Sequence, residues 1–143
     1  MSASLEATSP AGSPGKGLHV WLWIVQGLLA AAFLMAGGMK LFTPIAQLSQ
    51  KMPWVAQAPL LPRFIGVSEI AGALGLILPA ATRVKPGLTA LAALGLLTIM
   101  VLAVPFHFMQ NDAAHAPIPA VLGLLAAFVA WGRFRKAPIP ART

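Results

Sequence analysis

Four long apolar runs restrict what this chain can fold into more than any other feature of its sequence. They cover about residues 19–39, 61–79, 86–108 and 117–132, and short segments that contain proline and charged residues separate them. A helix needs about 20 apolar residues to cross the hydrocarbon core of a bilayer. The runs therefore predict an all-α, polytopic membrane protein whose four spans pack as one helical bundle.

The amino-acid composition agrees with a membrane protein. Hydrophobic residues make up 58% of the 143 residues and charged residues only 9%, whereas a water-soluble domain carries about 25% charged residues. The net charge is +7, but the basic residues lie mainly at the ends of the apolar runs, so we expect contact with the lipid bilayer and not with nucleic acid. The chain has no cysteine, which excludes disulfides and thiolate metal sites within it.

The segments outside the runs complete the domain organisation. Residues 1–17 are rich in Ser, Ala, Gly and Pro, and we expect a disordered N-terminal tail there. Residues 18–133 hold the bundle, and residues 134–143 form a basic C-terminal tail. In the first connection, the pair Thr43-Pro44 is typical of an N-cap and a first helical position. A short helix over about 44–52 is therefore predicted to lie at the membrane interface.

The basic residues are distributed unevenly between the two sides of the membrane. Four spans place both chain ends on the same side, together with the turn between the second and third spans. Seven basic residues belong to that side: Lys16, Arg83, Lys85, Arg133, Arg135, Lys136 and Arg142. The other side has three, which are Lys40, Lys51 and Arg63. The positive-inside rule therefore predicts cytoplasmic N- and C-termini.

Glu69 is the most unusual residue of the apolar runs, because it places a carboxylate well inside the second span. Such residues are candidates for function by default, and a structural ion pair that fixes helix register is the alternative. Three of the four residues at helical spacing from Glu69 are small, namely Gly66, Gly72 and Ala73, so a neighbouring helix can approach on this side. Arg63 lies off this face, and we expect it to extend to the membrane surface.

Three more polar residues are candidates for a site with Glu69. Lys40 ends the first span on a helical face that also contains Gln26 and Gly37, and this face is predicted to point into the bundle. His107 ends the third span on the same side of the membrane as Lys40. We interpret Glu69 and His107 as candidate catalytic residues. Candidate ligand-binding residues are Gln26, Lys40, Glu69 and His107.

Each of these residues also has a structural interpretation. Lys40 would extend to the interface, as lysines at the end of a span usually do, or it would pair with Glu69. His107 would be an interfacial residue, and Gln26 would donate a hydrogen bond between helices. An aspartate and a second histidine follow His107 in the next loop, but their spacing fits no standard metal-binding motif, so no metal site is predicted.

Two segments of the chain match a known pattern. GGMKLF at residues 37–42 ends the first span, and RFIGVSEIAGALGLILP at residues 63–79 forms the second; a basic turn and a third span that ends near a histidine follow. From about Trp21 to Trp131 the chain thus resembles the DoxX-like family of small four-helix membrane proteins. The resemblance implies a multi-pass protein of a bacterial inner membrane. It also implies a link to redox chemistry, because some relatives are membrane subunits of thiosulfate:quinone oxidoreductases.

Two hypotheses about function follow. In the first, the chain is a redox-associated membrane subunit that binds a quinone or another apolar small molecule in the outer half of the bundle. Glu69 would exchange protons with the ligand, and Lys40 and His107 would complete the polar end of the site. The chain has no evident electron carrier, so it would be at most one subunit of a quinone-linked oxidoreductase, beside a partner that bears the cofactor.

In the second hypothesis, the chain is a non-enzymatic membrane protein. It would serve as a scaffold, an assembly factor or a small transport protein, and Glu69 and Lys40 would be a structural pair. The fourth span has no polar side chain and contains several alanines, so it would pack against a partner, either in a homo-oligomer or in another complex.

Overall fold

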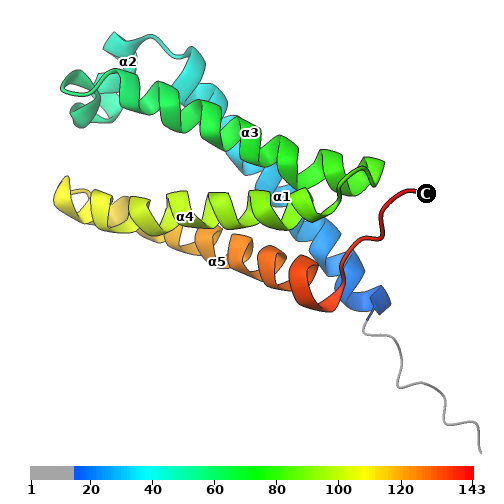
Figure 1. Cartoon of the computed structure of the whole chain (residues 1–143). Coiled ribbons are helices and arrows are strands. Elements are labelled where there is room, and N and C mark those ends of the chain that lie inside the picture. Colours follow the sequence, from blue (N-terminus) through cyan, green and yellow to red (C-terminus); the bar gives the residue numbers. More distant parts are fainter. Residues whose placement is uncertain (1–14) are drawn as a thin grey trace, which may run out of the picture.

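The computed structural model describes residues 15–143, and all regular structure within these residues is helical. Four long helices make up the bundle in Figure 1: α1 (Gly15–Phe42), α3 (Leu60–Thr82), α4 (Gly87–Met109) and α5 (Pro117–Trp131). Each is long and apolar enough to cross a membrane, α5 together with the turns that flank it. The prediction of an all-α bundle with four membrane spans is thereby confirmed.

The ends of the long helices differ from the expected limits. Residues 15–17 already belong to α1, although we expected them in the N-terminal tail. Residues 1–14, the rest of that tail, lie outside the described part of the chain. A short 3-10 turn, η2 (Ala113–His115), precedes α5, and a π-helical turn, η3 (Gly132–Lys136), follows it. The turn η3 extends the helical chain beyond the last apolar run.

The connection between α1 and α3 contains a short helix, α2 (Ile45–Lys51), and a 3-10 turn, η1 (Pro53–Ala56). The start of α2 differs from the prediction, because Thr43 does not cap it. The Thr43 N–H donates to Met39 O at 3.1 Å, which places Thr43 at the end of α1, and Pro44 occupies the N-cap position of α2.

The long helices pack as two antiparallel pairs, α1 with α3 and α4 with α5, and α3 and α4 join the pairs. In Figure 1 the pairs diverge towards the end that carries α2, while the start of α1 and the C-terminus lie at the other end. We call these the α2 end and the tail end. Trp54 of η1 contacts Phe106 of α4 with ring centroids 5.1 Å apart, so the connection bridges the pairs at the α2 end. The buried core consists of Leu29, Ala30, Phe33, Ala73, Leu76, Ala93, Leu96, Met100, Ala126, Val129 and Ala130.

Large apolar side chains cover the outside of the bundle. The most exposed include Leu28, Met35, Phe64, Leu102 and Leu124, which come from all four long helices. Soluble monomers rarely expose apolar surface on this scale, whereas hydrocarbon chains of a bilayer contact it favourably. The backbone of each span satisfies its own hydrogen bonds as an α-helix, which is what a lipid environment requires.

Candidate functional site

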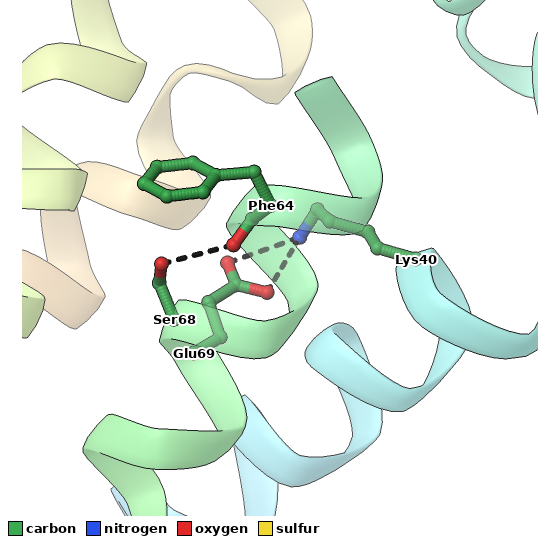
Figure 2. Close-up of polar contacts among 4 residues, drawn as sticks. All are labelled: Lys40, Phe64, Ser68 and Glu69. Carbon is green, nitrogen blue, oxygen red and sulfur yellow. Dashed lines mark hydrogen bonds and ion pairs between the residues drawn. The ribbon is translucent and has the colours of Figure 1, made fainter. Parts of the chain in front are cut away.

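Lys40 and Glu69 form an ion pair between α1 and α3. The Lys40 ammonium donates to Glu69 Oε1 at 3.0 Å and to Oε2 at 2.9 Å, so one nitrogen contacts both carboxylate oxygens (Figure 2). Glu69 is 2% exposed, and 16% of the Lys40 side chain is exposed. Lys40 therefore turns into the bundle instead of extending to the interface. The structure brings these two predicted site residues together.

Two glycines allow this contact. Gly37 lies one helical turn before Lys40, and Gly66 lies one turn before Glu69, so each glycine shares a helix face with the charge that follows it. A methyl group built on either glycine would lie 2.8 Å from the carbonyl oxygen of the other. Larger residues at these positions would separate α1 from α3 and move the lysine away from the carboxylate.

Arg63 stabilises the end of α1 from the first turn of α3. Its Nη1 donates to Lys40 O at 2.8 Å and to Leu41 O at 2.6 Å. The last carbonyls of a helix have no partner within the helix, and a positive charge there also interacts favourably with the helix dipole. Arg63 is partly buried in these contacts, and its bonds to the end of α1 were not predicted from the sequence.

His107 lies at the same end of the bundle but makes its polar contact elsewhere. Asp112 contacts His107 Nδ1 at 2.9 Å through Oδ2 and His115 Nδ1 at 2.5 Å through Oδ1. An ionised carboxylate only accepts hydrogen bonds, so each histidine presents its Nδ1–H to it. The bond from His115, and then the bond from His107, hold the pKa of Asp112 below its usual range. Within residues 15–143 no group of three or more metal-ligating side chains is arranged to hold a metal ion.

The sequence of the chain matches the model of one protein family. The model of the DoxX-like family matches residues 24–129, a segment that contains the Lys40–Glu69 pair and most of the bundle. The chain belongs to the DoxX-like family. No curated protein and no solved structure matches it significantly. The resemblance found in the sequence is thereby confirmed, and together with the four apolar helices it identifies a multi-pass integral membrane protein that contacts the lipid bilayer.

In this DoxX-like protein, Gln26 belongs to a second polar cluster, at the tail end. Its buried side chain donates from Nε2 to Leu76 O at 2.7 Å, and its Oε1 accepts from Arg133 Nε at 2.6 Å. The bond to Leu76 is a contact between helices of the kind that the structural interpretation predicts. The contact with Arg133 was not predicted. Arg133 follows the last apolar run and belongs to a series of basic residues. It is buried because of the path that the chain takes in η3.

The structure thus divides the predicted site residues of the DoxX-like protein among three clusters. Lys40 and Glu69 form an ion pair inside the bundle. His107, in the last turn of α4, contacts Asp112 of the following loop, and Gln26 accepts a hydrogen bond from the buried Arg133 at the tail end. Chemically, the ion pair neutralises two charges and holds two helices. Catalytic and ligand-binding roles of these residues stay predictions.

Proposed function

We propose that this DoxX-like protein is a non-enzymatic membrane scaffold in which Lys40 and Glu69 form a structural pair. The observation that supports this most directly is that the Glu69 carboxylate is already paired and almost fully buried. Both Glu69 oxygens contact one ammonium, at 3.0 and 2.9 Å, and only 3% of the side chain is exposed. A carboxylate in this state is neutralised by its partner and offers little access to a substrate. Its position beside the close contact of Gly37 and Gly66 suits a residue that fixes helix register.

A scaffold needs a surface for another membrane protein, and the α4–α5 pair supports one. An apolar hollow of about 140 Å³ lies between these helices, and Ala120, Gly123 and Ala127 of α5 contribute to it. Small residues let a partner helix approach closely inside a membrane. We propose that a helix of a second copy of the chain, or of another subunit, packs along this face.

We further propose that the protein lies in the inner membrane with both termini in the cytoplasm. The proposal rests on the excess of basic residues on the side of the C-terminal tail, following the positive-inside rule. Fusions to residue 143 test it directly. A reporter that works only in the cytoplasm should be active there, and activity of an exported reporter at the same position would overturn the orientation.

One observation favours a second candidate function at the same pair. Lys40 donates two N–H groups to Glu69, and its side chain keeps 16% of its surface exposed, so a third N–H is left for a ligand carbonyl. A quinone or another apolar small molecule would accept this bond in the outer half of the bundle. Glu69 would then exchange protons with the ligand, and a cofactor-bearing oxidoreductase subunit would supply electrons.

One experiment separates the two candidates. Wild-type protein, Glu69→Gln and Ser68→Ala are purified in mild detergent, and bound small molecules are identified by absorbance and by mass spectrometry of a lipid extract. Ser68→Ala is the matched control, because Ser68 adjoins Glu69 but donates to Phe64 O of its own helix, at 2.9 Å (Figure 2).

The scaffold proposal expects no retained quinone in any sample and a lower stability of Glu69→Gln than of Ser68→Ala. A quinone that stays with wild type and Ser68→Ala, and that is lost from a folded Glu69→Gln protein, would overturn the scaffold proposal in favour of ligand binding.

A further inference from the structure

Among the described residues, the tail end buries a positive charge without a carboxylate partner. Arg133 is 4% exposed. The two acidic side chains within residues 15–143 lie at the α2 end, where Glu69 pairs with Lys40 and Asp112 contacts two histidines. Buried charges are normally paired, because the loss of hydration is otherwise uncompensated.

Neutral groups around the Arg133 guanidinium use only part of its hydrogen-bonding capacity. Nε donates to Gln26 Oε1 at 2.6 Å, and Nη1 donates to Ala137 O at 2.9 Å and faces His19 Nδ1 at 2.9 Å. Nη2 is buried and has no hydrogen-bond partner among the described residues. The Trp23 ring lies 5.6 Å from the guanidinium carbon, a cation–π contact that adds attraction but accepts no conventional hydrogen bond.

His19 has hydrogen-bond donors on both sides. Trp23 Nε1 donates towards His19 Nε2 at 3.1 Å, and Arg133 Nη1 faces His19 Nδ1 at 2.9 Å. The indole and guanidinium groups are donors only, and a neutral imidazole has a single acceptor nitrogen. One of these two donors therefore finds no acceptor on His19. The cluster as a whole has more donors than acceptors, and an anion is the kind of ligand that supplies acceptors and negative charge together.

A surface cavity of about 370 Å³ lies beside this cluster, and His19, Trp23 and Arg83 are among the residues that line it. The rest of the lining is apolar and comes from the end of α3 and from the C-terminal tail. Arg83 also holds the tail in place: its Nε donates to Pro140 O at 2.9 Å, and Arg142 N–H donates to Arg83 O at 2.9 Å. The cavity is thus a defined space between two secondary-structure elements and the tail.

The chemistry of the lining combines positive charge with apolar surface. Arg83 brings a charge to the cavity itself, and Arg133 lies behind the wall that His19 and Trp23 form. Further basic residues of the α3–α4 turn, of η3 and of the tail are Lys85, Arg135, Lys136 and Arg142. Such a distribution attracts anions, and near a membrane it attracts anionic lipid headgroups.

We propose that this cavity binds the phosphate group of an anionic amphiphile. Arg83 contacts the phosphate, Arg133 supplies fixed positive charge behind His19 and Trp23, and the apolar lining accepts the adjoining part of the ligand. A membrane phospholipid and a soluble phosphate ester share this chemistry, and the experiment below distinguishes these two sources. The proposal is independent of any role of Lys40 and Glu69.

The test uses the full chain in detergent and native mass spectrometry to count bound ligand. Phosphatidylglycerol and phosphatidylcholine with the same acyl chains are titrated separately, and glycerol 3-phosphate is titrated as the soluble phosphate ester. The variants are Arg83→Gln and Arg133→Gln, and Arg135→Gln is the matched control because Arg135 is exposed in the same turn as Arg133. Thermal unfolding shows whether each variant is folded. If Arg133→Gln does not fold, Arg83→Gln and the two-lipid comparison carry the test.

A charge-assisted hydrogen bond that is lost weakens binding roughly tenfold or more, whereas removal of one charge near a membrane surface weakens it about fivefold at most. We expect phosphatidylglycerol to bind more tightly than phosphatidylcholine and to lose roughly tenfold or more in Arg83→Gln. Arg133→Gln removes a charge behind the lining and no hydrogen bond to the phosphate, so it should weaken binding less than Arg83→Gln but more than Arg135→Gln. If glycerol 3-phosphate binds and the same variants weaken its binding, the result supports the phosphate site and identifies a soluble phosphate ester as the source of the ligand. Equal affinity for both lipids without binding of glycerol 3-phosphate overturns the proposal, and so does an equal loss in Arg135→Gln.

Discussion

The two ends of the bundle bury a charged side chain in opposite ways. Near the α2 end, Glu69 is 2% exposed and both of its oxygens contact Lys40. At the tail end, Arg133 is 4% exposed and contacts a glutamine, a histidine, a carbonyl and a tryptophan ring, all without formal negative charge. The first charge is neutralised within the described chain, and the second is not.

The difference shows that burial alone does not reveal what a charged residue does in a membrane protein. A buried ion needs compensation of several kcal/mol, and the source of that compensation is the informative part. Where the chain supplies an opposite charge, as for Glu69, the ion pair itself provides the compensation. Where the described residues supply only neutral hydrogen-bond acceptors, as for Arg133, the missing compensation is the observation from which we propose an anion site.

The largest expected effect comes from Lys40→Met, which makes the α2 end resemble the tail end by leaving Glu69 buried without a counter-ion. We expect the free energy of unfolding to fall by about 3–5 kcal/mol, the usual result when one partner of a buried pair is removed. Glu69→Gln should cost less, because Lys40 is partly exposed and can extend to the interface. Reversible unfolding by SDS in mixed micelles measures both. Equal losses in the two variants would contradict this asymmetry.

A double variant sharpens the same comparison. Lys40→Met combined with Glu69→Leu replaces both charges with apolar groups, and replacement of a complete buried pair is often close to neutral. We expect the double variant to recover most of the stability that Lys40→Met loses. A double variant as unstable as Lys40→Met alone would mean that the pair contributes specific geometry and not merely charge neutralisation.

Gln26→Leu tests the tail end, where neutral hydrogen-bond acceptors compensate the burial of the Arg133 charge. The change removes the Oε1 acceptor of Arg133 and the side-chain donor that Gln26 directs at the Leu76 carbonyl. We expect the free energy of unfolding to fall by about 2–3 kcal/mol, because a buried charged group then lacks an acceptor. Thr98→Val is the control, since Thr98 is exposed and donates only to Leu94 O of its own helix. A loss no larger than that of the control would show that Arg133 does not depend on Gln26.

Gly37→Ala tests whether the ion pair depends on the close approach of α1 and α3. The added methyl group would lie 2.8 Å from Gly66 O, and we expect the helices to separate at a cost of about 1–3 kcal/mol. Gly38→Ala is the matched control, because a methyl group there meets nothing within 4 Å and alanine favours the helix. The same unfolding titration serves both. A Gly37→Ala protein as stable as Gly38→Ala would remove the glycine contact from the explanation of the pair.

The four spans and the Lys40–Glu69 contact were predictable from the sequence for physical reasons. Each span is visible as an apolar run of membrane length. The contact follows because each charge lies on a small helix face, and because the topology places both in the same half of the bundle. Local spacing and a simple topology therefore predicted the spans, and they gave the pair as one of two outcomes for Lys40, beside extension to the interface.

Arg63 and Arg133 could not be placed in the same way. Each lies near the end of an apolar run, where a basic residue normally extends to the interface. Their actual positions depend on the path of the chain beyond the span. Arg63 reaches α1 only because the connection returns α3 to it. Arg133 is turned inward by η3, where a methyl group on Gly132 would lie 2.5 Å from a methyl carbon of Leu22, a close packing that no periodicity in the sequence indicates.

Asp112 provides the exposed counterpart of the pair at Glu69, and we expect the smallest effect there. It also contacts two partners, His107 and His115, but it lies in a loop at the surface, where ion pairs are weak. The hydrogen bonds of the histidines hold the pKa of Asp112 below its ordinary value of 3.8. A carboxylate with a lowered pKa stabilises the folded state at pH values above the ordinary pKa, and this contribution is lost as the pH falls through the folded value.

The pH dependence of Asp112→Asn therefore has a defined sign. The melting temperature of wild-type protein should exceed that of Asp112→Asn by a small amount at about pH 5–6, where Asp112 is ionised in the folded and in the unfolded state. The difference should shrink as the pH falls below 3.8, because protonation then removes the acceptor from the wild-type protein as well. Melting curves of both proteins in detergent between about pH 3 and pH 6 cover this window. A difference that grows on acidification would contradict the lowered pKa, and a large difference at every pH would mean that an exposed pair contributes as much as the buried one at Glu69.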